Sequence, residues 1–389
     1  MDPDLSALDE FLAEQDGDGY LFESGSDDSD HFYVSGFDAP DPFVTLYTPD
    51  GTHILTKELE YGRAVEESRA DTVTRHSDYD AEASYGGFDA YVDVVARFLD
   101  DHGVASVAVP QRFPAAVADG LRAAGVDVAP ETDGVVTDIR ATKTDEEVEW
   151  IRQAQAANEK AMATVEDLLR AATAEDGTLH LDGEALTSER VKTELETTLL
   201  EERCGLDEAI VAGGPDGAEP HNRGSGPLPA DEPIVVDIFP RSKATKYHGD
   251  MTRTFVKGAP SDAAREFYDL TETAFEAALD AVAAGVPAAE VHGAACEVYE
   301  DAGYPTLRSE PGAETGFIHS TGHGIGLDVH EAPGVNDRTD ESLRAGHVVT
   351  IEPGLYDPDV GGVRIEDAVV VTDDGYRNLT DYPVEFVLE

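Results

Sequence analysis

Three of the chain's twelve histidines fall within one glycine-rich segment, residues 319–330. Glycines at positions 322, 324 and 326 give up side-chain contacts and let the backbone approach an ion or a ligand closely. They also count against a helix, because each glycine costs roughly 1 kcal/mol relative to alanine in a helix interior. The segment alone also fits purely structural histidines, so its interpretation depends on the acidic residues found elsewhere.

Two aspartates stand in or beside apolar runs, where an ionised carboxylate is costly unless it is paired or bound to a metal. Asp237 lies inside the strand-like run 234–239, and Asp250 directly precedes the run 251–256. These two runs are expected to pair as a hairpin. That pairing would bring both aspartates to one place.

Two glutamates near the C-terminus show the same pattern. Glu352 ends the apolar strand 348–351, just before a Pro-Gly turn. If 363–371 forms one strand, its two-residue period puts Arg364 and Glu366 on the same face. That polar face is expected to line a cavity.

Each of these carboxylates alone could be a solvated group on an edge strand. Together, their four negative charges balance two divalent cations, and a neutral imidazole would complete the set. Oxygen-rich ligands of this kind suit Mn²⁺, Co²⁺ or Fe²⁺ at least as well as Zn²⁺. The expected ligands of a two-metal site are Asp237, Asp250, His323, Glu352 and Glu366.

The part of the chain that precedes these motifs has the pattern of a compact α/β domain and contains no catalytic motif. Its expected strands cover residues 31–34, 44–47, 53–56 and 105–109, and its expected helices cover 5–13 and 91–101. Its histidines are interpreted as surface or structural residues; they are His31, His53, His76 and His102.

A connector over 138–143 is expected to separate this domain from the rest, giving domains 1–138 and 139–389. Thr144 and Glu147 then form a capping-box signature that begins a long helix. Residues 175–183 are expected to form a loop, and the loop 213–217 delivers His221. A further helix is predicted over 186–204, and two more, over 261–282 and 288–301, are expected to cover a sheet.

Acidic residues outnumber basic ones, 82 to 27, for a formal net charge of -55 and a pI near 4.2. Nucleic acid and anionic membranes would be repelled, so neither is expected as a partner. The acids are spread along the whole chain, which favours a halophilic folded protein over a disordered acidic tail, since about 1 M salt shortens the Debye length to roughly 3 Å.

Two cysteines, Cys204 and Cys296, suggest neither a disulfide framework nor a thiolate metal site. No apolar run approaches the length of a membrane span, and the acidic start predicts no signal peptide. The expected location is therefore the cytoplasm.

The ordered motifs resemble those of the pita-bread metallopeptidases, in the Xaa-Pro aminopeptidase and Xaa-Pro dipeptidase (prolidase) branch. The resemblance covers about residues 140–389 and rests on Asp237, 250–254, 319–330, 350–354 and 364–367. It implies an α/β (α+β) protein with a C-terminal pita-bread (creatinase/aminopeptidase) domain and a smaller N-terminal creatinase/prolidase-like domain. A homodimer that acts on peptides with proline at the second position is also implied.

The resemblance implies that Asp237 chelates one metal, that Asp250 and Glu366 bridge both, and that His323 and Glu352 hold the other. Manganese is expected, with Co²⁺ or Zn²⁺ as alternatives. The expected catalytic residues are Glu352, which passes a proton to the leaving nitrogen, His330, which stabilises the oxyanion, and His319. The expected substrate-binding residues are His221, His319, His330 and Arg364.

Several alternatives remain at this stage. His330 could be purely structural, and a metal-free peptide-binding or creatinase-like member of the fold is the main rival function. Methionine aminopeptidase is a nearer rival, but it normally lacks an N-terminal domain. The hairpin from Asp237 to Asp250 is two residues longer than is usual in the family. An insertion of two keeps the facing of a strand pair, so segment 241–246 is expected to alter specificity more than metal binding.

Overall fold

The structure is a computed structural model that describes residues 3–79 and 87–389. The chain divides into two compact units, Met1–Arg140 and Ala141–Glu389, and each is described by itself. Helix α7 (Val135–Ala141) occupies much of the region expected to be a connector. The domain division after residue 138 stays a prediction.

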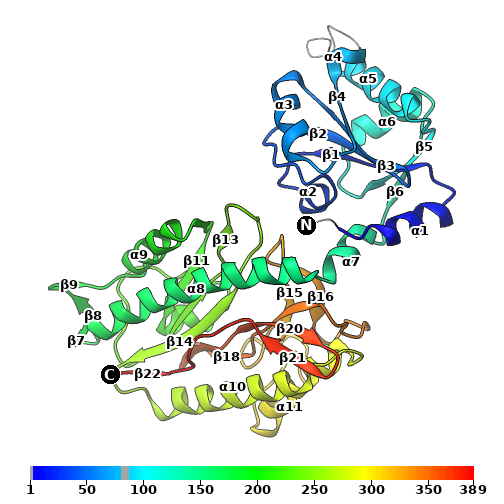
Figure 1. The fold of residues 1–389 in the computed structure, drawn as a ribbon. Helices are drawn as coiled ribbons and strands as arrows, with labels where there is room; N and C mark the ends of the chain where they lie inside the picture. The colour runs from blue at the N-terminus through cyan, green and yellow to red at the C-terminus, as the bar shows by residue number, and fades with distance from the viewer. Residues whose placement is uncertain (1–2, 80–86) are drawn as a thin grey trace. The chain divides into compact units, whose positions relative to one another are not determined.

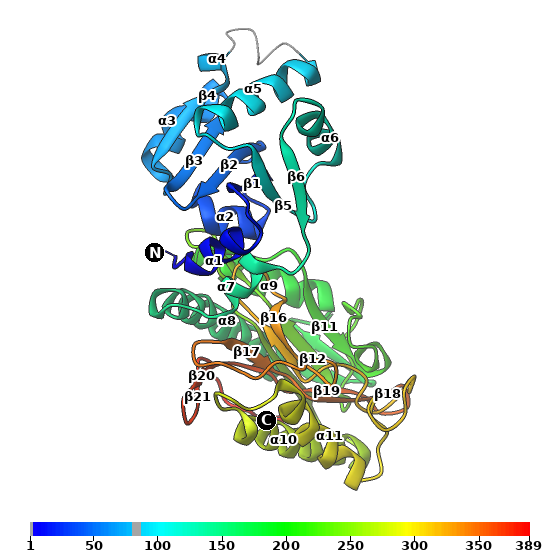
Figure 2. The ribbon, with the colours of Figure 1, turned by 90° about the vertical axis from the view of Figure 1, so that its right-hand side faces the viewer.

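In the described part of the N-terminal unit, six strands form one mixed sheet in the order β4-β3-β2-β1-β5-β6 (Figure 2). Strands β1, β2 and β3 pair antiparallel, whereas β4, β5 and β6 join them in parallel. The strands are β1 (Gly19–Ser24), β2 (Phe43–Thr48), β3 (Gly51–Thr56), β4 (Thr72–Arg75), β5 (Ser106–Pro110) and β6 (Asp127–Glu131). The helices are α1 (Ser6–Glu14), α2 (Ser29–Ser35), α3 (Glu58–Glu67), α4 (His76–Tyr79), α5 (Gly87–Asp101) and α6 (Ala115–Ala123).

Both faces of this sheet are covered by helices, as the alternation of buried residues along β2 illustrates. Val44 and Leu46 pack in one cluster with residues of α5 and α6, whereas Phe43 packs on the opposite side with Ala64 of α3. The expected strands over 44–47, 53–56 and 105–109 and the expected helices over 5–13 and 91–101 are confirmed within a few residues.

The expected strand over 31–34 is wrong, because these residues belong to helix α2. The Asp28 carboxylate accepts the backbone N–H of His31 and caps the helix, while Gly36 ends it at φ 65°. These two helix-end signals outweigh the strand propensity of residues 31–34, which lie between them. His31 is fully buried between Phe22 and Phe43, in agreement with a structural role.

The C-terminal unit is also a mixed α/β structure (Figure 1). Its helices are α8 (Asp145–Ala171), α9 (Ser188–Glu201), α10 (Asp262–Ala281), α11 (Ala288–Asp301) and the 3-10 helix η2 (Gly214–Ala218). One four-stranded sheet contains β11 (Ala209–Gly213), β12 (Ile234–Ile238), β14 (Met251–Lys257) and β22 (Val387–Leu388). A five-stranded sheet contains β16 (Glu331–Val335), β15 (Gly322–Gly324), β17 (Val348–Ile351), β20 (Asp367–Thr372) and β21 (Gly375–Asn378).

Short strands complete the unit. They are the hairpin β18 (Gly354–Asp357) and β19 (Gly361–Arg364), the pair β10 (Cys204–Gly205) and β13 (Arg241–Ser242), and the three-stranded β7 (Thr173–Glu175), β8 (Thr178–Leu181) and β9 (Glu184–Ala185). The last group corrects the loop expected over 175–183. Its Asp176 and Asp182 adopt positive φ angles of 50° and 59°, so the same polar residues that indicated a loop make tight hairpin turns.

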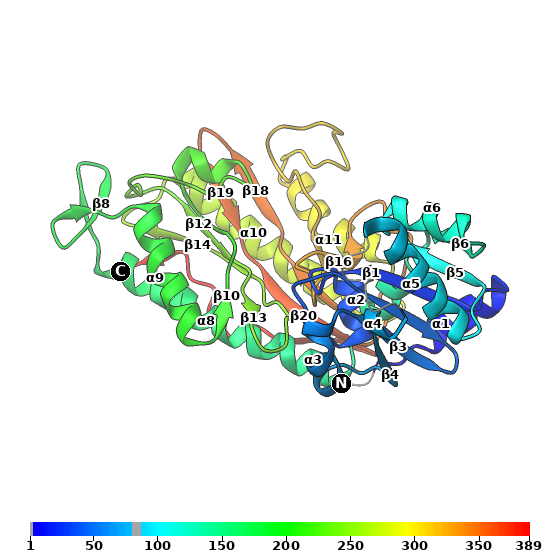
Figure 3. The ribbon, with the colours of Figure 1, turned by 90° about the horizontal axis from the view of Figure 1, so that it is seen from above.

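Helices pack on both sheets (Figure 3), and the expectation that the helices over 261–282 and 288–301 cover a sheet is confirmed by α10 and α11. Apolar residues of α8 and α9 pack with Val236 and Phe255 of the four-stranded sheet. Apolar residues of α10 and α11 pack with Val349 and Val369 of the five-stranded sheet. On the opposite face of the four-stranded sheet, a small apolar cluster of Ile210, Ala212 and Val235 lies beside polar residues such as Asp237 and Thr252.

Helix α8 begins with the capping box expected from the sequence, in which the side chains of Thr144 and Glu147 each accept the backbone N–H group of the other residue.

In the described segments of the chain, no helix is both long and apolar enough to span a membrane.

Candidate functional site

All the residues singled out by sequence line one cavity of about 470 Å³ in the C-terminal unit. They are His221, Asp237, Asp250, His319, His323, His330, Glu352, Arg364 and Glu366. The cavity lies where the uncovered faces of the two sheets supply polar side chains. Its lining therefore joins residues that are far apart in the chain.

The two aspartates come from the hairpin of β12 and β14, which pair antiparallel with Asp237 opposite Thr252. Val236 and Ile238 pack into the core beneath α8 and α9, so the period of the strand turns Asp237 to the cavity. Asp250 precedes β14 and is held through its backbone. Its N–H donates to Gln155 Oε1 (2.8 Å), and Gln155 Nε2 donates to its carbonyl oxygen (3.0 Å).

The two glutamates follow strands of the other half of the unit. Glu352 lies directly after β17, and Thr350 Oγ1 donates to its Oε1 at 3.3 Å. Residues 363–371 do not form the single strand expected, because β19 ends at Arg364 and β20 begins at Asp367. Between them, the Glu366 N–H donates to the Thr252 carbonyl (3.1 Å) and its Oε2 accepts from Thr252 Oγ1 (2.8 Å). Glu366 is thus held by the aspartate hairpin.

His323 is carried by a segment that is pressed against neighbouring backbone. A Cβ at Gly322 would lie 1.8 Å from the Thr350 carbonyl oxygen, and one at Gly324 would lie 2.2 Å from that of Ala332. Both positions therefore require glycine, as the sequence pattern indicated.

The orientation of the His323 ring follows from its neighbours. Its Nδ1 lies 3.1 Å from the Gly324 carbonyl oxygen, which can only accept, so Nδ1 carries the proton. Nε2 then faces the acidic residues, 3.2 Å from Glu352 Oε1 and 3.7 Å from Asp250 Oδ2. The ligand atoms of Asp250, His323 and Glu366 lie within 4.8 Å of one another.

The electrostatics of this cluster fit a bound cation. Burial raises the pKa of Asp237, Asp250 and Glu366, and in Asp250 and Glu366 the charges of neighbouring carboxylates raise it further. Asp237 Oδ1 is buried and has no hydrogen-bond partner. Ionising such a group of carboxylates together requires a compensating positive charge, which divalent ions supply. The donor set therefore fits the two metal ions expected from the sequence.

His323 and Glu352 shift each other's pKa in opposite directions. Burial acts to lower the pKa of His323, but the hydrogen bond and charge of Glu352 raise it to about 9. Burial likewise acts to raise the pKa of Glu352, but His323 lowers it to about 2. A proton or a metal ion at Nε2 would satisfy the same carboxylate.

Arg364 connects the acidic cluster to residues that the sequence did not single out. Its Nη2 donates to Asp237 Oδ2 (2.7 Å), its Nε to Thr252 Oγ1 (3.1 Å) and its Nη1 to the Tyr356 hydroxyl (2.8 Å). The Tyr356 hydroxyl also lies 2.9 Å from His319 Nε2. Thr252 could have been found, because it alternates with Asp250 on the expected strand. Tyr356 offered no comparable signal, since its place follows from the pairing of β18 with β19.

His319 has both ring nitrogens engaged. Its Nδ1 lies 2.7 Å from the Ser320 carbonyl oxygen and therefore carries a proton. Burial lowers the pKa of His319 to about 4, so the ring is neutral near pH 7 and Nε2 accepts from the Tyr356 hydroxyl. His330 instead packs edge-on against His323, with ring centroids 4.3 Å apart.

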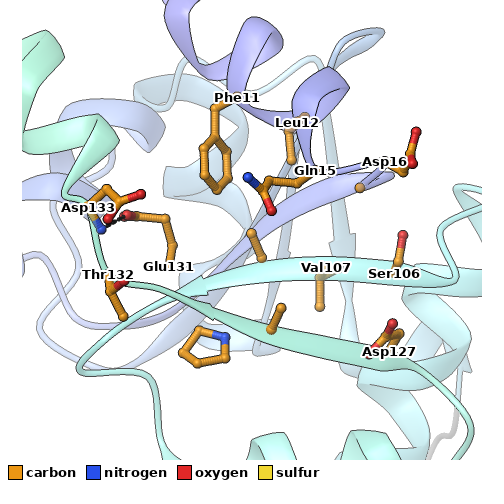
Figure 4. Close-up of a pocket in the computed structure, with 14 residues that line it drawn as sticks. Phe11, Leu12, Gln15, Asp16, Ser106, Val107, Asp127, Glu131, Thr132 and Asp133 are labelled. Atoms are coloured by element: carbon orange, nitrogen blue, oxygen red, sulfur yellow. Dashed lines mark hydrogen bonds between the residues drawn. The ribbon is translucent and has the colours of Figure 1, made fainter.

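Another cavity, of about 230 Å³, lies in the N-terminal unit between α1 and strands β5 and β6 (Figure 4). Phe11 of α1 and Gln15, which follows α1, lie on the side of the cavity opposite β5 and β6. Glu131 Oε1 accepts the backbone N–H groups of Asp133 and Gly134 just before α7, which accounts for this carboxylate structurally. None of the described residues that line this cavity is a histidine or a basic residue.

Two family profiles match the chain. Metallopeptidase family M24 matches residues 149–373, and the Creatinase/Prolidase N-terminal domain matches residues 5–152.

Individual proteins are similar over nearly the whole length. The Xaa-Pro dipeptidase of Pyrococcus furiosus is 29% identical over 353 residues, which cover 90% of each chain. Among solved structures, an Xaa-Pro dipeptidase from Bacillus anthracis has a TM-score of 0.83 at 26% identity and covers 98% of each chain. An X-Pro aminopeptidase from Thermotoga maritima has a TM-score of 0.80 at 27% identity, covering 96% of this chain and 98% of that one.

Proposed function

The chain belongs to metallopeptidase family M24, and we propose that it hydrolyses the peptide bond between an N-terminal residue and a following proline. Relatives named Xaa-Pro dipeptidase, similar over nearly the whole chain, support this substrate class. The observation that carries the proposal is the gathering of three buried carboxylates with raised pKa values, Glu352 and the Nε2 face of His323 around one cavity.

We propose that Asp237 binds one divalent ion, that Asp250 and Glu366 bridge two, and that His323 and Glu352 bind the other. The backbone bonds that hold Asp250 and Glu366 support a bridging role, because they anchor Asp250 to Gln155 of α8 and Glu366 to Thr252 of β14, two residues after Asp250. When bound, two such ions supply an activated water near neutral pH and polarise the scissile carbonyl.

The chain's own residues supply orientation and proton transfer. The pKa of Glu352 is held low by His323, so its carboxylate is ionised and would first accept the proton that the attacking water loses. It would then pass this proton to the departing proline nitrogen as that nitrogen becomes basic. We assign the direct substrate contacts to His221 and His330, and oxyanion stabilisation to His330. His319 acts as a positioning residue, because it accepts from the Tyr356 hydroxyl. Arg364 fixes Asp237 through Nη2.

Finer properties are also part of the proposal. Manganese is preferred because the ligands are mainly oxygens. The acidic composition supports work at high salt in the cytoplasm. A homodimer and the choice between aminopeptidase and dipeptidase are carried over from the resemblance, and relatives bear both activity names. The metal-free alternative is not favoured, because all five ligand positions are filled.

The function can be tested with purified protein in molar KCl, with Mn²⁺, Co²⁺ or Zn²⁺ added in turn. Ala-Pro, a longer Ala-Pro peptide and Ala-Ala are compared by release of free alanine. We expect cleavage of at least one proline substrate and little cleavage of Ala-Ala. Equal rates on Ala-Pro and Ala-Ala would rule out proline specificity, and metal-independent cleavage would rule out the mechanism.

A further inference from the structure

A second cavity of about 310 Å³ adjoins the catalytic cavity in the C-terminal unit. Phe239, which follows β12, and Val329, which precedes His330, line both cavities. The remaining lining comes from the end of β10 and the residues just after it, and from the hairpin loop around β13. A substrate held in the catalytic cavity would therefore lie next to this second space.

The lining of the second cavity is basic, in contrast to the rest of the chain. It includes Arg241, Lys243 and Lys246, and Asp207 is the one carboxylate among its described lining residues. Acidic residues outnumber basic ones 82 to 27 in the whole chain, so three cations beside one acid reverse the local balance. Such a local excess of positive charge favours an anionic ligand.

The loop that carries these cations is held by backbone contacts. Strand β13 pairs with β10, with Arg241 opposite Gly205, and the Lys243 N–H donates to the Arg203 carbonyl at 3.1 Å. The Lys246 N–H donates to the Ser242 carbonyl at 2.9 Å and closes the turn. Arg241 and Lys243 are therefore presented from an anchored backbone.

Two of these cations lack an acidic partner. Among the described residues, no carboxylate lies within 4.0 Å of the charged groups of Arg241 or Lys243, Asp207 included. Arg241 uses only Nε, which donates to the Lys246 carbonyl at 3.1 Å. Its two terminal nitrogens are left to a ligand, and a guanidinium with both of them available matches a carboxylate in a bidentate contact.

We propose that this basic pocket, formed by Arg241 and Lys243 beside Phe239 and Val329, receives a carboxylate of the peptide substrate. The inference rests on the proposed function and adds a preference to it. The carboxylate could come from an acidic side chain on the first residue or from the C-terminus of a dipeptide. In both cases the contact selects peptides by charge at a point away from the acidic cluster.

The two sources are distinguished by paired substrates that differ in one charge. Glu-Pro is compared with Gln-Pro for the side chain, and Ala-Pro with Ala-Pro-amide for the C-terminus. kcat/KM is measured at fixed KCl for the wild type, Lys243→Gln and Arg241→Gln/Lys243→Gln. For each pair, the ratio of kcat/KM for the charged peptide to kcat/KM for its neutral counterpart measures the preference for charge. For one of the two pairs, we expect this ratio to fall about tenfold below its wild-type value in the double variant, and to fall by less in Lys243→Gln.

The matched control is Lys160→Gln, which removes one positive charge from an exposed ion pair with Glu202 outside both cavities. It is expected to change neither ratio. Lys243 is exposed, so its single variant is expected to fold even if the double variant does not. Unchanged ratios in Lys243→Gln and in a folded double variant would overturn the proposal. A changed oligomeric state with unchanged ratios would assign the cations to a contact between copies instead.

A binding measurement keeps this result separate from the activity. Calorimetry with the metal-free protein compares Glu-Pro with Gln-Pro, and Ala-Pro with Ala-Pro-amide. We expect the charged member of one pair to bind about tenfold tighter to the wild type, with the preference lost in the double variant. If the wild type cleaves no proline peptide, the proposed function fails. The calorimetric comparison still shows whether the basic pocket binds a carboxylate. An equal preference for the charged peptide in the wild type and the double variant would reject the proposed carboxylate pocket.

Discussion

Replacing Lys143 by methionine is expected to lower the free energy of unfolding of the C-terminal unit by about 3–5 kcal/mol. Lys143 Nζ lies 2.7 Å from Glu331 Oε2, and the two side chains are only 1% and 3% exposed. Methionine keeps much of the volume but removes the positive charge that faces a buried carboxylate. Because neither side chain is open to water, solvent screening does not reduce the loss as it would at the surface.

The surroundings of Glu331 extend this effect to the site. Its Oε1 accepts the backbone N–H of Asp328 at 2.9 Å, and its Oε2 would lie 2.7 Å from a Cβ at Gly326. Glu331 therefore holds the backbone of the segment that ends at His330. We expect Lys143→Met to lower catalytic activity as well as stability.

Unfolding by urea at fixed KCl can be followed by the fluorescence of Trp150, the only tryptophan, which packs against Tyr247 in the C-terminal unit. Lys160→Met is the control. Its partner Glu202 is 2.7 Å away, but the side chains of Lys160 and Glu202 are 57% and 34% exposed. We therefore expect Lys160→Met to lower the free energy of unfolding by less than about 1 kcal/mol.

Adding Glu331→Gln to Lys143→Met should recover part of the loss, because a neutral amide costs less to bury than a carboxylate. If Lys143→Met and Lys160→Met lower the free energy of unfolding by the same amount, the reasoning from burial is refuted.

Three further outcomes are expected. Glu366→Ala should reduce kcat by at least about 10³-fold and lower the bound metal measured by atomic absorption, since it removes a proposed bridging carboxylate; full activity would exclude the two-metal mechanism. Tyr356→Phe should lower kcat/KM by roughly tenfold with unchanged metal content, because Arg364 and His319 both lose a hydroxyl partner. Burial lowers the pKa of His31 to about 3 from 6.5, so its unfolded form takes up the proton first. His31 should therefore contribute a loss of up to about 1.4 kcal/mol of stability per pH unit from pH 6.5 downwards, and His31→Gln should make the slope of stability against pH less steep in denaturation curves taken between pH 7 and 4.

The structure brings the acids chosen from the sequence into one cavity, and they could be chosen because acids in apolar runs are exceptional. Asp237 inside an apolar strand is costly without a counter-charge, so the neighbouring residues single it out, although its chemistry follows only from all four acids together. The capping box of Thr144 and Glu147 was equally local, and it is present in the structure. Features that depend on a few adjacent residues can be predicted in this way.

The sequence did not indicate two kinds of feature. In one, helix-end signals compete with strand propensity, and in the other, a residue's contacts come from distant segments of the chain. Residues 31–34 have strand propensity, but Asp28 and Gly36 outside the run decide for a helix. The run 363–371 reads as one strand, yet the backbone of Glu366 bonds Thr252 and leaves the ladder. The partners of Tyr356 come from the segment that holds His319 and from β19, so no local pattern predicts them.

The tight backbone around Gly322 and Gly324 restricts how the enzyme can be diversified. Any heavier residue at either position would collide with a carbonyl oxygen, so mutation there cannot yield a graded change in activity. The turn at Lys243 and Ala244 is exposed and tolerates new side chains without repacking. A laboratory selection for altered peptide preference is thus expected to collect substitutions in that turn while both glycines persist.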